Sequence, residues 1–241
     1  MERILLLACF AALILFNPAN AQDEHASASE GDTTTTVISF LNGLKTDNLK
    51  YYSSHKIEFF SELAKGQHPA ATIITCSDSR VHTNMMDATP EGQLFMVRNI
   101  GNQLATAEGS VEYGVHHLHT PVLLIIGHSR CGAIAAATSN YSKESPSIKR
   151  ELDTITISKD LNNIDGVRAN VNNQVATAML KFDEEVKEGK LTVIGAIMDF
   201  ADDLHQGTGK LSIINVSGET DANKLANLEA VLKAKKAKQK K

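Results

Sequence analysis

The sequence contains no tryptophan, and aromatic residues make up only 5% of its 241 positions. Long apolar runs are also missing, because the longest, residues 4–16, is shorter than the ~20 residues that a membrane-spanning helix needs. Neither sign of charge dominates: the formal net charge is -4, and we therefore expect no nucleic-acid partner. Only three cysteines are present, which excludes a closed zinc site of four thiolates.

The first residues have the pattern of a signal peptide. Arg3 gives a weakly basic start, residues 4–16 are apolar, and Ala19-Asn20-Ala21 fits the small-x-small cleavage pattern. We expect a signal peptide over residues 1–21, cleavage after Ala21, and export to the periplasm. An uncleaved anchor is the alternative, and a lipid anchor on Cys9 is less favoured because only a short apolar stub precedes it.

The rest of the chain predicts one domain between two polar ends. Residues 22–36 are polar and acidic, which is typical of a flexible linker, and residues 37–232 form the predicted domain. Residues 233–241 hold six lysines and predict a solvated tail, with attachment to an anionic surface as the alternative. We find no internal repeat and no second domain.

Apolar, β-branched runs alternate with helical patterns along this domain. The runs predict strands at residues 71–75, 94–100, 122–126, 191–198 and 210–216. The helical patterns cover residues 37–44, 48–64, 81–88, 106–118, 131–138, 147–161, 167–188 and 221–232. This order predicts an α/β fold with a mostly parallel sheet of four strands, flanked by helices. The fifth strand follows a polar connection that permits a hairpin, so we expect it to lie antiparallel at an edge.

Soft and borderline metal ligands follow two of the predicted strands. Cys76 comes directly after the first strand, and His128 and Cys131 come after the third. Thiolates and imidazole suit zinc, and three protein ligands with one open position are typical of a catalytic zinc site. A Cys76–Cys131 disulfide is the alternative for an exported chain, but Asp78 and Arg80 beside His128 favour a metal site.

Two charged residues follow Cys76 at alternate positions. Asp78 can fill the fourth metal position at rest, or it can contact whatever fills that position. Pairing with Arg80 would keep the Asp78 carboxylate ionised and oriented. Because two thiolates neutralise the formal charge of Zn2+, we expect the pKa of a bound water, and with it the pH optimum, to be more alkaline than in a three-histidine site.

Four segments carry a family resemblance: CSDSR, VRNIGN, SVEYGV and GHSRCG. Together they resemble the β-class carbonic anhydrases over roughly residues 58–216. The resemblance implies reversible hydration of carbon dioxide to bicarbonate and a proton through zinc-bound hydroxide, with one zinc per subunit held by Cys76, His128 and Cys131. It also implies a gating pair of Asp78 and Arg80, and assembly into a homodimer or tetramer.

The plant-type branch of that family supplies the expected substrate contacts. By resemblance, these are the side chains of Gln67, Phe95, Ile100 and Tyr113, together with a backbone donor at Gly132. In the family the glutamine, phenylalanine and tyrosine come from the partner subunit, so a dimer would complete each site. The other branch has an allosteric bicarbonate site that uses a tryptophan; this chain has none, and we expect no such inhibition.

Some features depart from the family pattern or compete with the metal site. Arg130 stands where small residues are common, residues 82–84 replace a more usual proline-containing segment, and the loop at 202–209 looks long. His116, His117 and His119 resemble a metal cluster, but adjacent helical residues do not share a face, so we expect solvated or packing histidines. The alternative functions are a carbonyl sulfide or carbon disulfide hydrolase on the same scaffold, and a non-catalytic zinc-binding or redox protein.

Overall fold

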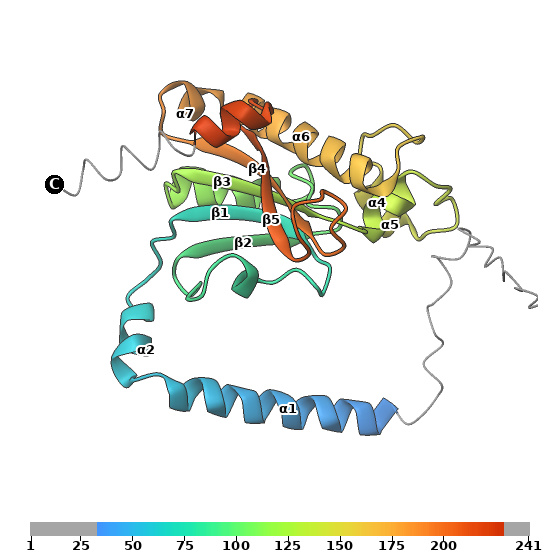
Figure 1. The fold of residues 1–241 in the computed structure, drawn as a ribbon. Helices are drawn as coiled ribbons and strands as arrows, with labels where there is room; N and C mark the ends of the chain where they lie inside the picture. The colour runs from blue at the N-terminus through green and yellow to red at the C-terminus, as the bar shows by residue number, and fades with distance from the viewer. Residues whose placement is uncertain (1–32, 229–241) are drawn as a thin grey trace, which may run out of the picture. The chain divides into compact units, whose positions relative to one another are not determined.

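A computed structural model describes residues 33–228 (Figure 1). The predicted signal peptide, most of the predicted linker and the lysine-rich tail lie outside the described residues. The chain divides after Phe60 into two compact units.

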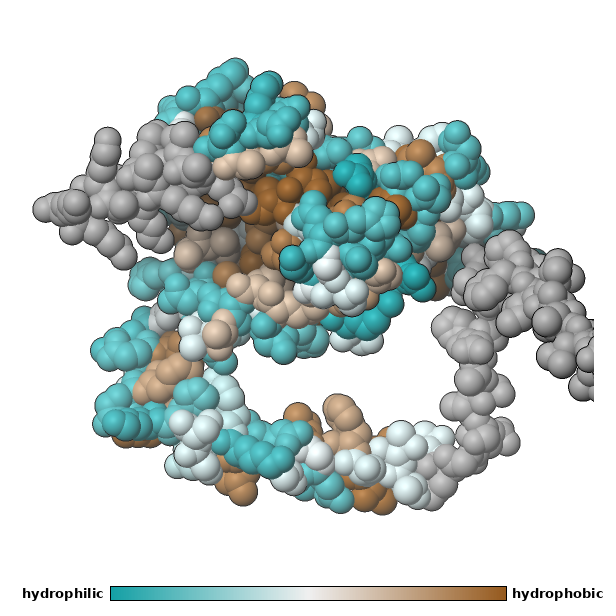
Figure 2. Space-filling view, viewed as in Figure 1, coloured by the Kyte–Doolittle hydropathy of each residue, from teal (hydrophilic) through white to brown (hydrophobic). Residues whose placement is uncertain are grey.

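The first unit consists of α1 (Thr33–Ser54) and the beginning of α2 (Ile57–Leu63). The helix α1 starts inside the range predicted as linker, and it runs unbroken through the gap predicted at residues 45–47. It buries none of its residues: Val37, Phe40 and Leu41 expose 49%, 69% and 46% of their surface. Figure 2 shows apolar side chains in brown along this helix. The apolar residues of α1 therefore gain no burial within their own unit.

The second unit is built on one five-stranded sheet, and the predicted fold class is confirmed. Its strands are β1 (Ala71–Cys76), β2 (Leu94–Asn99), β3 (Val122–His128), β4 (Thr192–Asp199) and β5 (Lys210–Val216). Their order is β2-β1-β3-β4-β5, with the first four strands parallel and β5 antiparallel at the edge. Strands β1, β3 and β4 are almost continuously buried, as expected for the interior of a parallel sheet.

The helices of this unit are shorter than the sequence predicted. They are α3 (Glu108–Glu112), the π-helix η2 (Tyr113–His117), α4 (Gly132–Ala137), α5 (Pro146–Leu152), α6 (Asn163–Lys181) and α7 (Asp183–Lys187), and residues 222–228 are also helical. Residues 81–88 form only the single 3-10 turn η1 (Thr83–Met85), and residues 153–161 are not helical. No described helix is both long enough and apolar enough to cross a membrane.

The predicted helix break at Asp165-Gly166 is wrong, because both residues lie in the first turn of α6. The side chain of Asn162 accepts a hydrogen bond from the backbone N–H of Asp165 at 2.9 Å, so the cap begins the helix before the pair. Gly166 is needed for packing: a Cβ there would lie 2.8 Å from a methyl carbon of Ile134.

The helix α6 packs directly on β3 and β4, and two glycines permit the close approach. A Cβ on Gly127 of β3 would lie 2.7 Å from Val171, and one on Gly195 of β4 would lie 2.8 Å from the same side chain. The opposite face of the sheet buries Ile73, Ile126 and Met198. The helix α6 thus lies close against β3 and β4 at these two glycines.

Candidate metal centre

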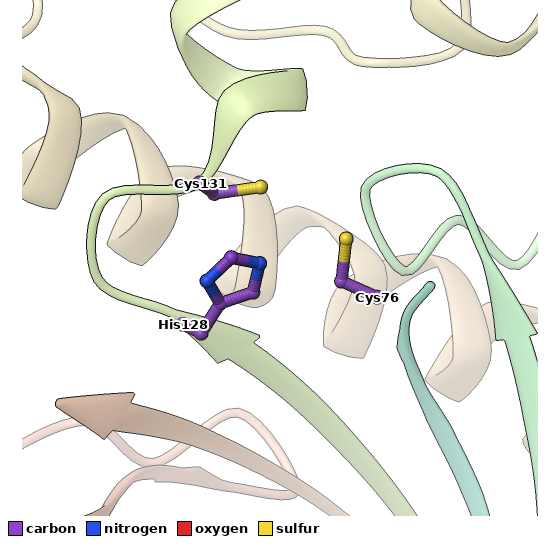
Figure 3. Close-up of side chains that lie close together, drawn as sticks. All are labelled: Cys76, His128 and Cys131. Atoms are coloured by element: carbon purple, nitrogen blue, oxygen red, sulfur yellow. The ribbon is translucent and has the colours of Figure 1, made fainter. Parts of the chain in front are cut away.

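Three potential ligands meet at the carboxyl edge of the sheet. Cys76 is the last residue of β1 and His128 the last of β3, and because these parallel strands are neighbours, their ends lie side by side. Cys131 follows in the loop that leads into α4. The sulfur atoms and a ring nitrogen lie within 4.8 Å of one another, and all three residues are buried (Figure 3). Within residues 33–228 they form the only such group of three.

The ring of His128 is oriented to offer one nitrogen. Its Nδ1 lies 3.1 Å from the backbone carbonyl of Ser129, and only a protonated Nδ1 can donate to that oxygen. The Nε2 is buried and has no hydrogen-bond partner among the described residues. A buried, unprotonated ring nitrogen without a partner is costly unless a ligand satisfies it. The orientation of His128 therefore fits a metal ion at Nε2.

The two thiols are free and strongly coupled to each other. The Cys131 thiol faces the sulfur of Cys76, and this contact lowers the pKa of Cys76 to about 4 against the opposing effect of burial. The same contact, together with burial, raises the pKa of Cys131. The contact thus favours ionisation of Cys76 over that of Cys131. Two sulfur ligands and one imidazole nitrogen, all buried, fit Zn2+.

Asp78 and Arg80 form the pair that the sequence predicted. The Arg80 Nε lies 2.9 Å from Asp78 Oδ1, and its Nη2 lies 2.7 Å from Oδ2, so the two side chains meet in a bidentate pair. This contact holds the pKa of the Asp78 carboxyl well below its usual range. The Asp78 Oδ2 also lies 3.7 Å from the Nε2 of His128. The carboxylate therefore faces both the arginine and the region on which the three ligands converge.

Other residues that the sequence did not single out hold these loops. The Arg98 guanidinium donates to the backbone carbonyls of Cys76 at 3.1 Å and of Asp78 at 2.7 Å. Arg98 lies in the VRNIGN segment, but its position relative to the metal ligands in the sequence did not indicate a role. The Nη2 of Arg80 donates to the carbonyl of Arg130 at 3.1 Å, which ties the loop after β1 to the loop after β3. Arg130 itself has a φ of +56°, the conformation that a small residue adopts most easily.

The connection after β4 forms one wall of the site. The Ser129 hydroxyl accepts the backbone N–H of Phe200 at 2.7 Å, and the Phe200 ring lies 5.3 Å from the Arg80 guanidinium and 6.0 Å from the ring of His128. Asp199 is buried, which opposes its ionisation, yet its hydrogen bonds from backbone N–H groups, including that of Leu204, outweigh burial and lower its pKa. This carboxylate anchors the wall that carries Phe200.

The five predicted substrate residues divide into two groups. Ile100 packs in the cluster that contains both cysteines, and Gly132 begins α4, where a Cβ would meet only open space. Phe95 and Tyr113 stack on each other at 5.8 Å, but Phe95 aligns with Thr72, four residues before Cys76. Four residues of strand span about 13 Å, so this pair lies away from the metal ligands of its own chain. Gln67 precedes β1, toward that same end.

The three neighbouring histidines do not form a metal group in the part of the chain that the structure describes. His116 pairs with Glu185 at 3.0 Å and packs edge-on against the ring of Phe182. The ring of His117 lies 4.5 Å from that of Tyr113. Packing and surface pairing therefore account for these two side chains.

Comparison with known proteins places this geometry in a family. The profile of the carbonic anhydrase family matches residues 71–208, which is more than half of the chain. A carbonic anhydrase from Synechococcus elongatus is 40% identical over 101 residues, 39% of this chain and 37% of that protein. Carbonic anhydrase 2 from Mycobacterium tuberculosis is 34% identical over 110 residues, 43% of this chain and 53% of that protein. The matches thus span about a third to a half of these relatives.

Solved structures show the same fold. One of two tetrameric β-carbonic anhydrases from Sordaria macrospora is 27% identical, with a TM-score of 0.59 over 73% of this chain and 97% of that chain. The β-carbonic anhydrase from Coccomyxa, solved with acetazolamide, has a TM-score of 0.62 over 78% of this chain and 90% of that chain; at 23% identity it supports the fold alone. With the Cys-His-Cys group at the sheet edge, these matches show that the chain belongs to the β-class of the carbonic anhydrase family.

Proposed function

We propose that this protein catalyses the reversible hydration of carbon dioxide, in which CO2 and water give bicarbonate and a proton, with one zinc ion per subunit. One observation carries the proposal: a buried His128 Nε2 without a partner and two free thiols converge beside an ionised carboxylate. Membership of the β-class and the fold support the same activity.

Cys76, His128 and Cys131 would hold the ion as two thiolates and a neutral imidazole. A zinc ion bound in this way supplies a Lewis acid that lowers the pKa of a water molecule. Arg80 keeps Asp78 ionised at neutral pH, so the Asp78 carboxylate can accept a hydrogen bond from the attacking water. Because the pKa of Asp78 is so low, this carboxylate cannot retain the proton that the reaction releases. Solvent or buffer takes up that proton.

Ile100 and Gly132 lie where they can meet the substrate within one chain. Ile100 contributes apolar surface beside the two cysteines, which suits the uncharged carbon dioxide. The N–H of Gly132 belongs to the first turn of α4, where backbone donors have no acceptor within the helix. We assign this N–H to an oxygen of the substrate.

We further propose that a homodimer or tetramer completes each site with Gln67, Phe95 and Tyr113 of the partner. Their placement toward the opposite end of β1 and β2 supports this, as does the unburied apolar surface of α1. The Sordaria macrospora relatives are tetrameric. Co-expression of a Cys131→Ser chain with a Tyr113→Ala chain tests it: randomly paired dimers should recover about a quarter of the wild-type activity if the sites are shared. No recovery in verified heterodimers would contradict sharing.

Stopped-flow carbon dioxide hydration, with the zinc content measured on the same sample, tests the activity. We expect hydration that requires zinc and that is lost in the Cys131→Ser variant. Zinc-loaded protein without hydration would defeat the proposal. Hydrolysis of carbonyl sulfide or carbon disulfide by that sample would then support the alternative hydrolase.

We also propose that the mature protein begins after Ala21 and is exported to the periplasm. The apolar segment at residues 4–16 and the small-residue pattern at Ala19-Asn20-Ala21 support it. Intact-mass analysis of the protein recovered from separated cell fractions tests both claims. A full-length mass in the cytoplasmic fraction would contradict them.

A further inference from the structure

One face of α6 directs amide side chains toward the core of the sheet unit. Asn163, Asn170 and Gln174 follow the spacing of a single helix face, on which Val167 and Val171 also lie. Asn170 is 1% exposed and Gln174 is 7% exposed. An amide buried in this way costs free energy unless every polar atom is satisfied. The hydrogen-bond partners of these amides therefore indicate what the amides do.

Asn163 forms two hydrogen bonds with the backbone of one metal ligand. Its Nδ2 donates to the carbonyl oxygen of Cys131 at 3.0 Å, and its Oδ1 accepts the N–H of Cys131 at 3.2 Å. Cys131 precedes the first turn of α4, and its own side chain makes no capping bond there. The position of its sulfur thus depends on the backbone of Cys131, which Asn163 holds at both its N–H and its carbonyl oxygen.

Asn170 holds the loop after β2, which lies beside Cys76. Its Nδ2 donates to the Gly101 carbonyl at 3.0 Å, and the Nε2 of Gln103 donates to the same oxygen at 2.6 Å. Gln103 in turn donates its N–H to the Oδ1 of Asn99 at 2.8 Å, and Asn99 pairs with Cys76 across β1 and β2. Gln174 holds the next part of this loop by accepting the N–H of Leu104 at 2.8 Å.

Gly101 admits no other residue. Its φ is +75°, and a Cβ there would lie 2.8 Å from Ile155. Its carbonyl oxygen accepts from both Gln103 and Asn170, so the loop that lies beside Cys76 is held at this point.

We propose that Asn163 and Asn170 are positioning residues that hold the two thiolate ligands in place before the ion binds, each through one of the two loops. A single rigid helix then sets the separation of both sulfurs. The inference rests on the proposed zinc site but not on the carbon dioxide chemistry. Side chains that orient metal ligands in this way typically contribute about 10–100-fold to metal affinity.

The test compares Asn163→Leu and Asn170→Leu with a matched control, Asn173→Leu. Asn173 lies on the same helix but is exposed, and its Nδ2 donates to the carbonyl of Thr156 at 2.7 Å. Zinc affinity is measured by chelator competition, and the thiolate-to-metal charge-transfer band is recorded after Co2+ loading. We expect both core variants to bind zinc about 10–100-fold more weakly with an altered Co2+ band, and the control to stay within about 2-fold.

Unfolding of the apoprotein separates positioning from general destabilisation. If Asn170→Leu does not fold, the half-buried Asn163 still carries the test. Asn163→Asp keeps the acceptor for the Cys131 N–H and loses the donor, so we expect an intermediate zinc affinity. An Asn163→Leu protein with wild-type affinity and an unchanged Co2+ band would overturn the proposal, as would an equal loss in the control. Zinc-binding wild-type protein without hydration activity would defeat the proposed function and leave this inference intact.

Discussion

Replacing Arg80 with glutamine should release Asp78 from its present orientation and lower the activity at unchanged zinc content. Arg80 is the only residue seen to bond both oxygens of the Asp78 carboxylate in the described structure. Without the guanidinium, the pKa of Asp78 returns toward about 3.9, and the carboxylate can turn toward His128 Nε2, which is 3.7 Å away. It would then occupy the region that the substrate needs.

The size of the effect follows from the two charge-assisted bonds, at 2.9 and 2.7 Å. Each such bond contributes about 1.5–3 kcal/mol when it is well shielded from water. The Arg80 side chain is 47% exposed and that of Asp78 is 18% exposed, so screening by solvent reduces the pair to about 2 kcal/mol in total. Loss of 2 kcal/mol corresponds to a fall of about 30-fold in kcat/KM.

Stopped-flow carbon dioxide hydration on samples of known zinc content measures this fall. Arg80→Lys keeps the charge but cannot form the bidentate pair, so we expect an intermediate loss of about 10-fold. Arg150→Lys, an exposed arginine on α5, is the matched control and should change nothing. Zinc-loaded Arg80→Gln protein within about 3-fold of the wild type would refute the reasoning.

Four further predictions concern protonation, packing and the wall of the site. Because the pKa of Cys76 is lowered to about 4 and that of Cys131 is raised, zinc binding near pH 7 should release about one thiol proton. Calorimetry in buffers of different ionisation enthalpy measures the number of protons released, and a release of two protons would contradict the assignment. The depressed Cys76 pKa should also make the apoprotein more stable as pH rises from about 4 toward about 8.5, since the thiol keeps its proton in the unfolded chain over that range. Urea denaturation at several pH values measures this, and a midpoint that falls as pH rises would contradict the prediction. Gly127→Ala should lower the free energy of unfolding by about 1–3 kcal/mol because its Cβ meets Val171, whereas Gly109→Ala, which meets nothing within 4 Å, should be neutral or stabilising in the same urea titration. Phe200→Leu removes a ring that stabilises Arg80 by about 0.5–1 kcal/mol, and it should reduce kcat/KM about 3-fold. Phe200→Tyr keeps an aromatic ring and should stay near the wild-type kcat/KM. Equal losses of kcat/KM in both variants would exclude the ring contact as the cause.

The convergence of Cys76, His128 and Cys131 was predictable from local patterns. Each follows or ends an apolar run of the kind that forms a buried parallel strand, and the carboxyl ends of neighbouring parallel strands share one edge. Asp78 and Arg80 are two residues apart, so their pairing needed only a turn of the chain. Residues this close in the chain, or at the ends of neighbouring strands, must lie near one another in the fold.

Helix boundaries were harder to predict because capping and packing compete with composition. Asp165-Gly166 looks like a break in sequence, but the Asn162 cap and the space beside Ile134 place it inside α6. The separate helices expected at residues 37–44 and 48–64 are instead one helix, α1, followed by the short α2. The Asn162 cap is a local signal, but the contact of Gly166 with Ile134 joins residues far apart in the chain.

The sequence by itself determined the parallel sheet with its antiparallel edge strand, the three soft ligands and the adjacent charged pair, because these depend on hydrophobic periodicity and on residues close together in the chain. Only the tertiary structure decided which side chains hold the ligands. Asn170 lies 69 residues from the Gly101 carbonyl that it contacts, and Phe200 comes to Arg80 from the far end of β4. In sequence they are ordinary polar and apolar residues, and they acquire a role because packing of α6 and β4 brings them to the loops around the metal ligands.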